Sequence, residues 1–244
     1  MLISCQHEYE TFVVSNTYMA STISYSATVS YQTTKKAKRN NIVVLRIPGD
    51  TGRSCLRIIG WPGDKIEIVN GNIYINNVIY TLPRSANSVY GVYRRDSDFS
   101  RLSDFNFKPY AGKYGMISAN QNEVDEIKEK GLVDSMYRLQ DKSADVDKLI
   151  IRTQTATHFN SYYFGPIYIP KIGDTLYQED HMLVRGYADF KKPYIVVAAA
   201  CYFCIGDSAD AMDSRIFGLV PESEILGVVT NIKNVRVMNI DESK

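Results

Sequence analysis

An Asn-Gly pair between two runs of alternating apolar residues is the feature that most constrains the fold of this chain. Residues 65–76 read KIEIVNGNIYIN, so isoleucines recur at every second position on either side of Asn70 and Gly71. Both turn residues tolerate the positive φ angles that a tight type I′ turn requires. The segment therefore predicts a β-hairpin with one buried face.

Short apolar runs before and after this hairpin predict more β structure. Four segments are expected to be strands: Ile42–Ile47, Leu56–Gly60, Pro193–Ile205 and Ile225–Ile240. The first two run into the turns Pro48-Gly49-Asp50 and Pro62-Gly63-Asp64, which are typical strand-ending residues. The fold class expected is therefore mainly β, with a core formed by residues 11–82 and 193–240.

The middle of the chain has a different pattern. Residues 84–110 are polar and aromatic with few periodic apolar positions. Asn120 and Glu123 have the spacing of a capping box, and Val124 and Ile127 give the following helix a thin apolar stripe that Gly131 would end. Short strands are expected at Leu149–Arg152 and Pro166–Pro170. We interpret residues 83–192 as an inserted β-rich cap of α+β character.

Composition excludes several classes of protein. The chain has 28 Lys and Arg against 27 Asp and Glu, a net charge of +1, so we expect no nucleic-acid partner. The longest apolar run, Tyr194–Ile205, is shorter than the roughly 18–20 residues needed to cross a bilayer. With hydrophobic residues at 45% and charged residues at 23%, the chain is a globular one.

The metal-binding residue types are few and scattered. Cys201 and Cys204 form a C-x-x-C pair, but positions i and i+3 of a strand point to opposite faces, so we interpret them as two packed thiols. The histidines His7, His158 and His181 show no paired-ligand spacing. We expect no metal site and no cofactor.

Three separated segments contain recognisable sequence boxes. Phe12–Ile23 resembles S-x-S-M-x-P-T-L. Arg39–Val44 and Leu56–Asp64 are similar to R-G-D-I-V-V and K-R-V-I-G-x-P-G-D. A third box matches in two parts, Tyr202–Asp207 and Asp213–Pro221. Together these segments resemble the boxes of the bacterial type I signal peptidases, and residues 164–173 resemble a stretch of the large-insertion members of that family.

The resemblance implies membrane-anchored serine peptidases with a Ser/Lys dyad, which remove signal peptides outside the cytoplasmic membrane. It also implies an antiparallel β core with an inserted β-rich cap, as the residue patterns do. The implied location is the extracytoplasmic face of the bacterial cytoplasmic membrane. Family members carry their anchor just before the first box. Eleven residues precede Phe12 here, so we expect that the anchor has been lost or removed.

The positions that match the family's dyad hold the wrong residues. Alignment on Met19 and Thr22 puts Tyr18 at the nucleophile position, and alignment on Arg57 puts Leu56 at the general-base position. A leucine cannot carry a proton, and a tyrosine of pKa about 10 without an adjacent base is a poor nucleophile. Asn16 falls at the oxyanion position, where it could still donate a hydrogen bond. We therefore expect no catalytic residues.

Other assignments of the nucleophile and base remain open. A shift of one residue would place Thr17 at the nucleophile position, and Ser15 or Ser21 could also serve. The candidate bases are the lysines near the second box: Lys35, Lys36, Lys38 and Lys65. The third box is one residue shorter than the family pattern, and its lysine-orienting Ser has no counterpart. Ser21 and Asn41 replace a Pro and an Asp of the pattern.

The residues that keep the family pattern are expected to be structural: Met19, Arg57, Asp64, Asp213, Ser214 and Arg215. Asp213 and Arg215 resemble a buried pair, which we expect to hold the last loop against the first box. Asp207 and Asp210 are interpreted as turn residues. Tyr18 and Leu56 are expected to lie close together on neighbouring strands, with no lysine amine near a hydroxyl of the first box.

The function predicted is that of a signal-peptidase-like protein without catalysis. It would have an accessory or peptide-binding role in processing or assembling exported proteins. The alternatives are an active signal peptidase with an atypical nucleophile or base, and a structural protein with a vestigial site. The partners expected are signal peptides or exported preproteins, including pilin-type substrates, and an active paralogue. Four apolar residues would form either core or shallow peptide pockets: Phe12, Val14, Met19 and Ile23.

Overall fold

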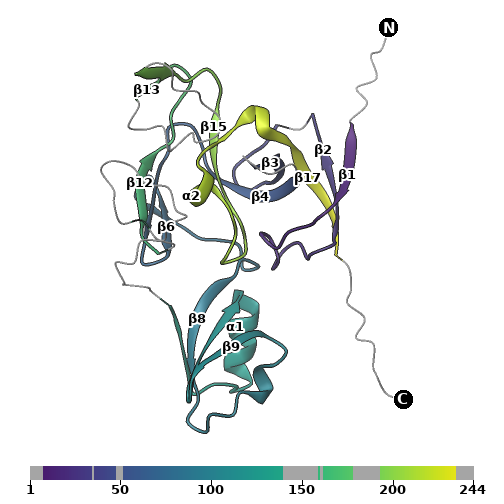
Figure 1. The fold of residues 1–244 in the computed structure, drawn as a ribbon, viewed down its shortest axis with the longest axis vertical. Coiled ribbons are helices and arrows are strands. Elements are labelled where there is room, and N and C mark those ends of the chain that lie inside the picture. Colours follow the sequence, from purple (N-terminus) through teal and green to yellow (C-terminus); the bar gives the residue numbers. More distant parts are fainter. Residues whose placement is uncertain are drawn as a thin grey trace.

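The computed structural model describes residues 8–34, 36–47, 52–139, 159, 162–177 and 193–234. Several sequence predictions lie outside these residues: the strand Leu149–Arg152, the turn at residues 48–50, the strand beyond residue 234, Lys35 and the three histidines. Within the described residues the chain is mainly antiparallel β, which confirms the predicted fold class. Figure 1 shows a large β body with a smaller β unit below it.

A seven-stranded sheet forms the centre of the β body, in the order β1-β2-β17-β3-β4-β15-β16. Its strands are β1 (Tyr9–Val13), β2 (Thr28–Gln32), β3 (Ile42–Arg46), β4 (Arg53–Gly60), β15 (Cys201–Ile205), β16 (Val220–Pro221) and β17 (Ile225–Lys233). All of its pairings are antiparallel. Strand β17, from the end of the chain, lies between β2 and β3, so strands from both ends of the chain share this sheet.

The Asn-Gly hairpin is confirmed. Strands β5 (Lys65–Val69) and β6 (Asn72–Ile75) pair antiparallel, and Asn70 and Gly71 have φ angles of 53° and 72°. A second tight turn at Asn76 and Asn77, which the sequence analysis missed, leads into β7 (Val78–Tyr80). With β12 (Phe164–Tyr168) these strands form a four-stranded sheet in the order β12-β5-β6-β7.

Both faces of the central strands β4 and β15 are buried. Ile59 and Phe203 lie in a cluster with Ile66 of the hairpin sheet, whereas Leu56 and Ile58 lie in a second cluster on the other face. Alternation along a strand explains this division, and it leaves β4 buried from Ser54 to Gly60. Cys201 and Cys204 fall in different clusters, as predicted, and both are free thiols.

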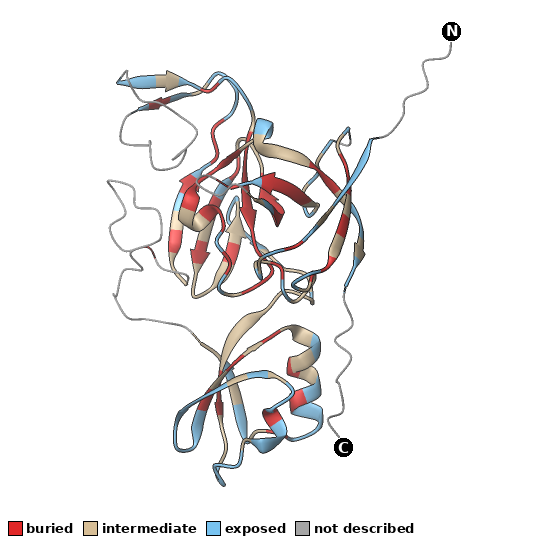
Figure 2. Cartoon of the chain, turned by 45° about the vertical axis from the view of Figure 1, so that its right-hand side comes forward, coloured by how far each residue is buried: buried red, intermediate tan, exposed pale blue. Residues whose placement is uncertain are grey.

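The cap is a second unit with its own core. Its sheet has the order β11-β8-β10-β9, from β8 (Ser88–Tyr93), β9 (Asn106–Ala111), β10 (Tyr114–Ala119) and β11 (Ser135–Arg138). The predicted helix is confirmed as α1 (Gln121–Glu129), with a complete capping box from Asn120 and Glu123. Val124 and Ile127 are buried against the sheet, and Figure 2 shows this narrow buried band.

Not every segment of residues 83–192 joins the cap. Strand β12 pairs with β5, and Phe164 and Ile167 fill the core beside Phe203. Residues 193–205 form two strands instead of one: β14 (Tyr194–Val196), which pairs with β13 (Thr175–Tyr177), and β15. The remaining elements are short: α2 (Ser214–Phe217) and two 3₁₀ turns, Ser100–Leu102 and Glu222–Glu224. The domain boundaries at 83 and 192 stay a prediction.

A candidate active site with a buried ion pair at its centre

The first box forms a loop between β1 and β2. Val14, Met19 and Ile23 are buried in this loop, so they are core residues and line no peptide pocket. Phe12 on β1 is half-buried and packs edge-on against Tyr31. The loop is closed at its base by Val14 N–H, which donates to the Ala27 carbonyl at 2.9 Å.

Leu56 and Tyr18 meet in one apolar cluster. The Leu56 side chain on β4 is fully buried, and the half-buried Tyr18 ring packs against the same group of residues, which includes Val43, Tyr202 and Phe217. Tyr18 lies in a turn of the loop and not on a strand, which differs from the arrangement expected from sequence. Position 56, which the sequence aligns with the general base of the family pattern, therefore has an apolar environment that suits leucine and would oppose an ammonium group.

The alternative nucleophiles and bases lie apart. Every lysine of the described residues is exposed, including Lys36, Lys38 and Lys65. A lysine that acts as a general base in this family is buried, and these amines lie in solvent instead. Ser15 and Thr17 are exposed, and the Ser21 hydroxyl donates to the Asp207 carbonyl at 3.1 Å.

Asn16, at the oxyanion position, is engaged by its neighbours. Its Nδ2 donates to Ser54 Oγ at 3.0 Å, and its Oδ1 accepts from the Tyr18 N–H at 3.3 Å. Ser54 is buried two residues before Leu56, on the same face of β4. The amide therefore joins the first box to the start of the second.

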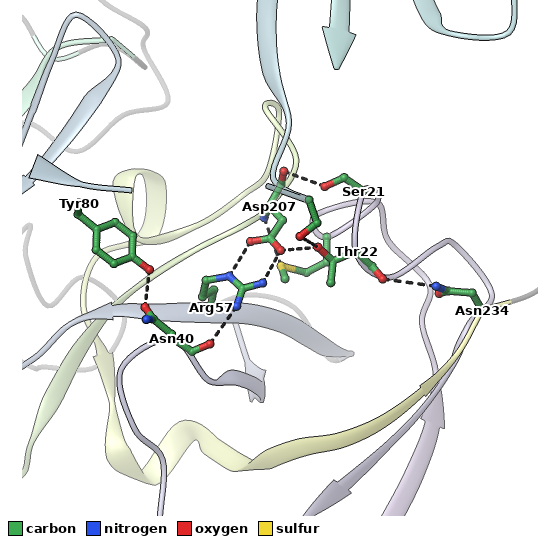
Figure 3. Close-up of polar contacts among 9 residues, drawn as sticks. Ser21, Thr22, Asn40, Arg57, Tyr80, Asp207 and Asn234 are labelled. Carbon is green, nitrogen blue, oxygen red and sulfur yellow. Dashed lines mark hydrogen bonds and ion pairs between the residues drawn. The ribbon is translucent and has the colours of Figure 1, made fainter. Parts of the chain in front are cut away.

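Arg57 and Asp207 form the buried centre of the site (Figure 3). Arg57 Nε and Nη2 donate to the two carboxylate oxygens of Asp207 at 2.9 and 2.6 Å, and the two side chains are 8% and 0% exposed. Arg57 Nη1 donates to the Asn40 carbonyl at 2.9 Å. Such bidentate pairs are short and directional, and leaving either partner unpaired in this environment is costly.

Asp207 also holds the first box and the start of the cap. The Thr22 hydroxyl donates to Asp207 Oδ2 at 2.5 Å and lies 3.0 Å from Ser85 Oγ, and the Asp207 N–H contacts the Met19 sulfur at 3.3 Å. Asn87 N–H, in the segment that enters the cap, donates to the Asp207 carbonyl at 2.7 Å. Three segments far apart in sequence therefore meet at one carboxylate-bearing residue.

The backbone of the third box presses against the first. Ser208 N–H donates to the Tyr18 carbonyl at 3.0 Å. A Cβ at Gly206 would lie 2.4 Å from that carbonyl oxygen and 2.2 Å from the Ala211 Cβ. Gly206 is therefore required by a close backbone approach and not by its φ angle.

Asp213 and Arg215 form their ion pair within the third box. Asp213 caps α2, pairs with Arg215 at 2.7 Å and accepts from the Gly206 N–H at 3.2 Å. Ser214 Oγ accepts from the Cys204 N–H at 2.9 Å. Contacts from the third box to the first are made by Asp207, which the sequence analysis interprets as a turn residue.

Asp64 organises the turn that leads into the hairpin. Its carboxylate accepts from Arg39 Nη2 at 2.7 Å, from the Trp61 N–H at 2.7 Å and from Asn76 Nδ2 at 2.8 Å. Asp64 is buried, so these donors replace the water that the carboxylate gives up. These contacts give Asp64 a structural role at the turn.

Two signals in the sequence could have identified the central pair. Gly206-Asp207 belongs to the matched part of the third box, and Arg57 to the matched part of the second. Within the described residues, no group of three metal-ligating side chains comes together. No helix among those residues has the length and apolar character needed to cross a membrane. The site thus consists of a hydrogen-bonded ion pair, Arg57 with Asp207, beside the apolar cluster that contains Leu56.

The fold and the site together define a class of protein. It is a mainly β protein in which three sequence boxes meet at the loop that follows β15. The model of the family "Signal peptidase, peptidase S26" matches residues 2–232. The chain therefore belongs to the signal peptidase family, which confirms the resemblance found in the sequence.

Two curated relatives are also similar to this chain. Signal peptidase I of Buchnera aphidicola from Acyrthosiphon pisum is 27% identical over 205 residues, which are 82% of this chain and 54% of the relative. The homologue of the strain from Schizaphis graminum is 26% identical, over 80% of this chain and 53% of the relative. The chain spans about half the length of these curated relatives.

A solved signal peptidase I from Enterococcus faecalis V583 is also similar, at 19% identity and a TM-score of 0.35. The match covers 80% of this chain and 98% of that chain. A TM-score this low does not bear on the fold, which the sheets described above establish by themselves.

Proposed function

We propose that this protein is a catalytically inactive member of the family that binds extended segments of exported preproteins. The burial of Leu56 at the general-base position, with Tyr18 packed on the same cluster, carries the proposal. A Ser/Lys dyad needs a desolvated amine within hydrogen-bond reach of a hydroxyl. The exposure of every lysine in the described residues supports the same conclusion.

The outer edge of β1 is the proposed peptide-binding surface. β1 is the terminal strand of the central sheet. Val14 N–H bonds to Ala27 and the Glu8 carbonyl accepts from Thr33, so even-numbered residues of β1 face β2. The backbone groups of Thr11 and Val13 then face the open edge, where a peptide could add as a strand.

The start of β4 supports this surface, because the described strands pair with it on one side only. Residues Arg53–Leu56 of β4 pair with β3 on one side, whereas β15 pairs only with the later part of β4. Such an edge gives affinity through backbone hydrogen bonds, which do not depend on a dyad. Binding would therefore outlast the loss of the nucleophile and the base.

The proposed role is accessory: holding signal peptides or exported preproteins, pilin-type ones included, during processing or assembly. The proposed location is the extracytoplasmic face of the bacterial cytoplasmic membrane, and an active signal peptidase paralogue is the proposed partner. Membership of the family supports these assignments.

A cleavage assay tests the inactive state. Purified protein is incubated with a preprotein that carries a small-x-small cleavage site, in detergent and in lipid. We expect no cleavage above a control without protein. Cleavage that disappears in Ser15→Ala, Ser21→Ala or Tyr18→Phe would instead establish an active peptidase and identify its nucleophile.

Peptide titration tests the binding surface. A labelled signal peptide should bind with a Kd in the micromolar range or above, as is common for short extended ligands. Thr11→Pro removes an outward N–H and should abolish binding, whereas Thr11→Ala keeps that N–H and should bind as wild type. Equal binding by both variants would refute strand addition at β1. A substitution at Val14 would not serve, because that side chain is buried.

A further inference from the structure

We propose that the cleft between the hairpin sheet and the cap binds an extended peptide that carries an acidic side chain. This cap–core cleft consists of two cavities of about 390 Å³ and about 90 Å³. The two cavities share five of their lining residues, which are Gly71, Ile73, Leu82, Ser88 and Arg138. The site lies apart from β1, and the inference does not depend on the proposed function.

Arg138 gives the cleft its charge preference. This half-buried side chain donates to two neutral acceptors, Asn72 Oδ1 at 3.2 Å and the Gly71 carbonyl at 3.1 Å. No carboxylate of the described residues pairs with it, although seven other arginines of the described chain form salt bridges: Arg39, Arg46, Arg53, Arg57, Arg84, Arg94 and Arg215. A half-buried guanidinium with neutral partners attracts a carboxylate, which it can bind in bidentate geometry.

The rest of the lining supports an anionic ligand. Among the described residues, neither cavity is lined by an aspartate or a glutamate. Arg84 lines the larger cavity and Arg215 the smaller one, each beside its own carboxylate partner. An acidic ligand side chain would therefore meet Arg138 without a competing negative charge in the described wall.

Strand β7 offers backbone hydrogen bonds to the same ligand. It is the terminal strand of its sheet, and its partner β6 joins it through a two-residue turn. In such a hairpin the flanking pair Ile75 and Val78 is hydrogen-bonded, so the N–H and C=O of Ile79 face the open edge. Val78 and Ile79 are 68% and 59% exposed, and Ile79 lines the larger cavity.

An unsatisfied acceptor lies in the wall of the smaller cavity. Asn87 Oδ1 is buried and has no hydrogen-bond partner among the residues that the structure describes. A donor group of a bound peptide would satisfy this acceptor. A volume of about 390 Å³ is that of a small-ligand pocket, so the occupant is a short peptide segment and not a folded domain.

Fluorescence anisotropy with two end-blocked hexapeptides tests the proposal on the full chain at low salt. One is labelled Thr-Val-Glu-Val-Thr-Val, and the other has Gln in place of Glu. We expect the Glu peptide to bind wild type about tenfold more tightly than the Gln peptide. No saturable binding, or equal affinities for the two peptides, would overturn the proposal.

Matched variants identify the residue responsible. Arg138→Gln should remove the preference for Glu, whereas Arg101→Gln should keep it, because Arg101 is exposed in the cap and lines neither cavity. Arg138→Glu should bind a Lys-containing peptide in preference to the Glu peptide, a gain that unfolding cannot produce. Loss of the preference in Arg101→Gln, or no reversal in Arg138→Glu, would contradict the assignment.

A backbone-modified peptide tests the contribution of strand β7. N-methylation of the peptide bond after Glu should weaken binding about tenfold if the peptide adds to β7. Unchanged affinity after N-methylation would refute strand addition at this edge.

Discussion

Arg57 and Asp207 are separated by 150 residues, yet Arg57 Nη2 and Asp207 Oδ2 lie 2.6 Å apart in the centre of the molecule. The arginine comes from β4 and the aspartate from the loop after β15. Because the same aspartate accepts from Thr22, this pair joins the second and third boxes to the first. The pair is the structural centre of the candidate site.

Asp207→Asn should lower the free energy of unfolding by about 3–5 kcal/mol, measured by urea denaturation at pH 7. The variant leaves the buried Arg57 without its counter-charge, and breaking one partner of a buried pair has that order of cost. Asp210→Asn is the matched control, since Asp210 is exposed in the same loop and contacts Ser208. Its cost should stay below about 1 kcal/mol. Equal costs for the two variants would contradict a central role for Asp207.

The double substitution Tyr18→Ser with Leu56→Lys should restore little or no cleavage of a preprotein. The new lysine would enter an apolar cluster, and the shortened third box supplies no hydroxyl to orient it. The variant should also be less stable than wild type by several kcal/mol, because the site provides no counter-charge. Cleavage above background, together with unchanged urea stability, would show that the cluster still accommodates a dyad.

The free energy of unfolding should fall as the pH rises from about 9 to 12, because the Cys55 thiol ionises in the unfolded chain first. Burial raises the pKa of the Cys55 thiol from 9.0 to about 12. Below pH 9 the thiol is protonated in both states, and its full contribution is present. Between pH 9 and 12 the unfolded chain loses this proton first, so stability falls by up to about 1.4 kcal/mol per pH unit.

Cys55→Ala provides the measurement of that contribution. The difference in unfolding free energy between wild type and Cys55→Ala, recorded from pH 8 to 11, should change in this window. A constant offset reports only the cavity left by the smaller side chain. If the two curves stay parallel, the thiol is not protected from ionisation in the folded state.

Asn120→Ala should destabilise the cap by about 1 kcal/mol. Asn120 Oδ1 accepts from the N–H groups of Asn122 and Glu123, and its own N–H donates to the Glu123 carboxylate. Loss of an N-cap has that typical cost. Amide hydrogen exchange should be faster in α1, and Asn120→Asp should restore the wild-type rate. Unchanged exchange in Asn120→Ala would show that the helix is held by packing alone.

Local patterns predicted the local structure correctly. The Asn-Gly hairpin and the capped helix follow from residues within one or two turns of each other, and both are confirmed. The cap strands β8 and β9 were missed because their alternation is weak, as in Ser88–Tyr93, where a glycine interrupts it. The pairing of β12 with β5 joins segments about a hundred residues apart, so no local pattern could predict it.

The roles within the third box could not be assigned from sequence for a physical reason. Asp207 and Asp213 lie in one loop, and both fit a turn or a buried pair. Which carboxylate turns toward the first box depends on where Arg57 lies, and this is set by the pairing of β4 with β15. Tyr18 was placed on a strand because the family box was read as extended, whereas turns at Met19 and Ile23 fold it back.

The contacts of Thr22 and Asn87 with Asp207 affect how members of this family can be classified. Arg57 belongs to the second box and Asp207 to the third, and both residues hold separate segments of the chain together. The residues at positions 18 and 56 can differ from the family pattern while these contacts are kept. Selection for a folded protein alone would therefore preserve most of the signature. A match to the boxes as a whole therefore indicates ancestry, whereas peptide cleavage has to be judged from the residues at positions 18 and 56.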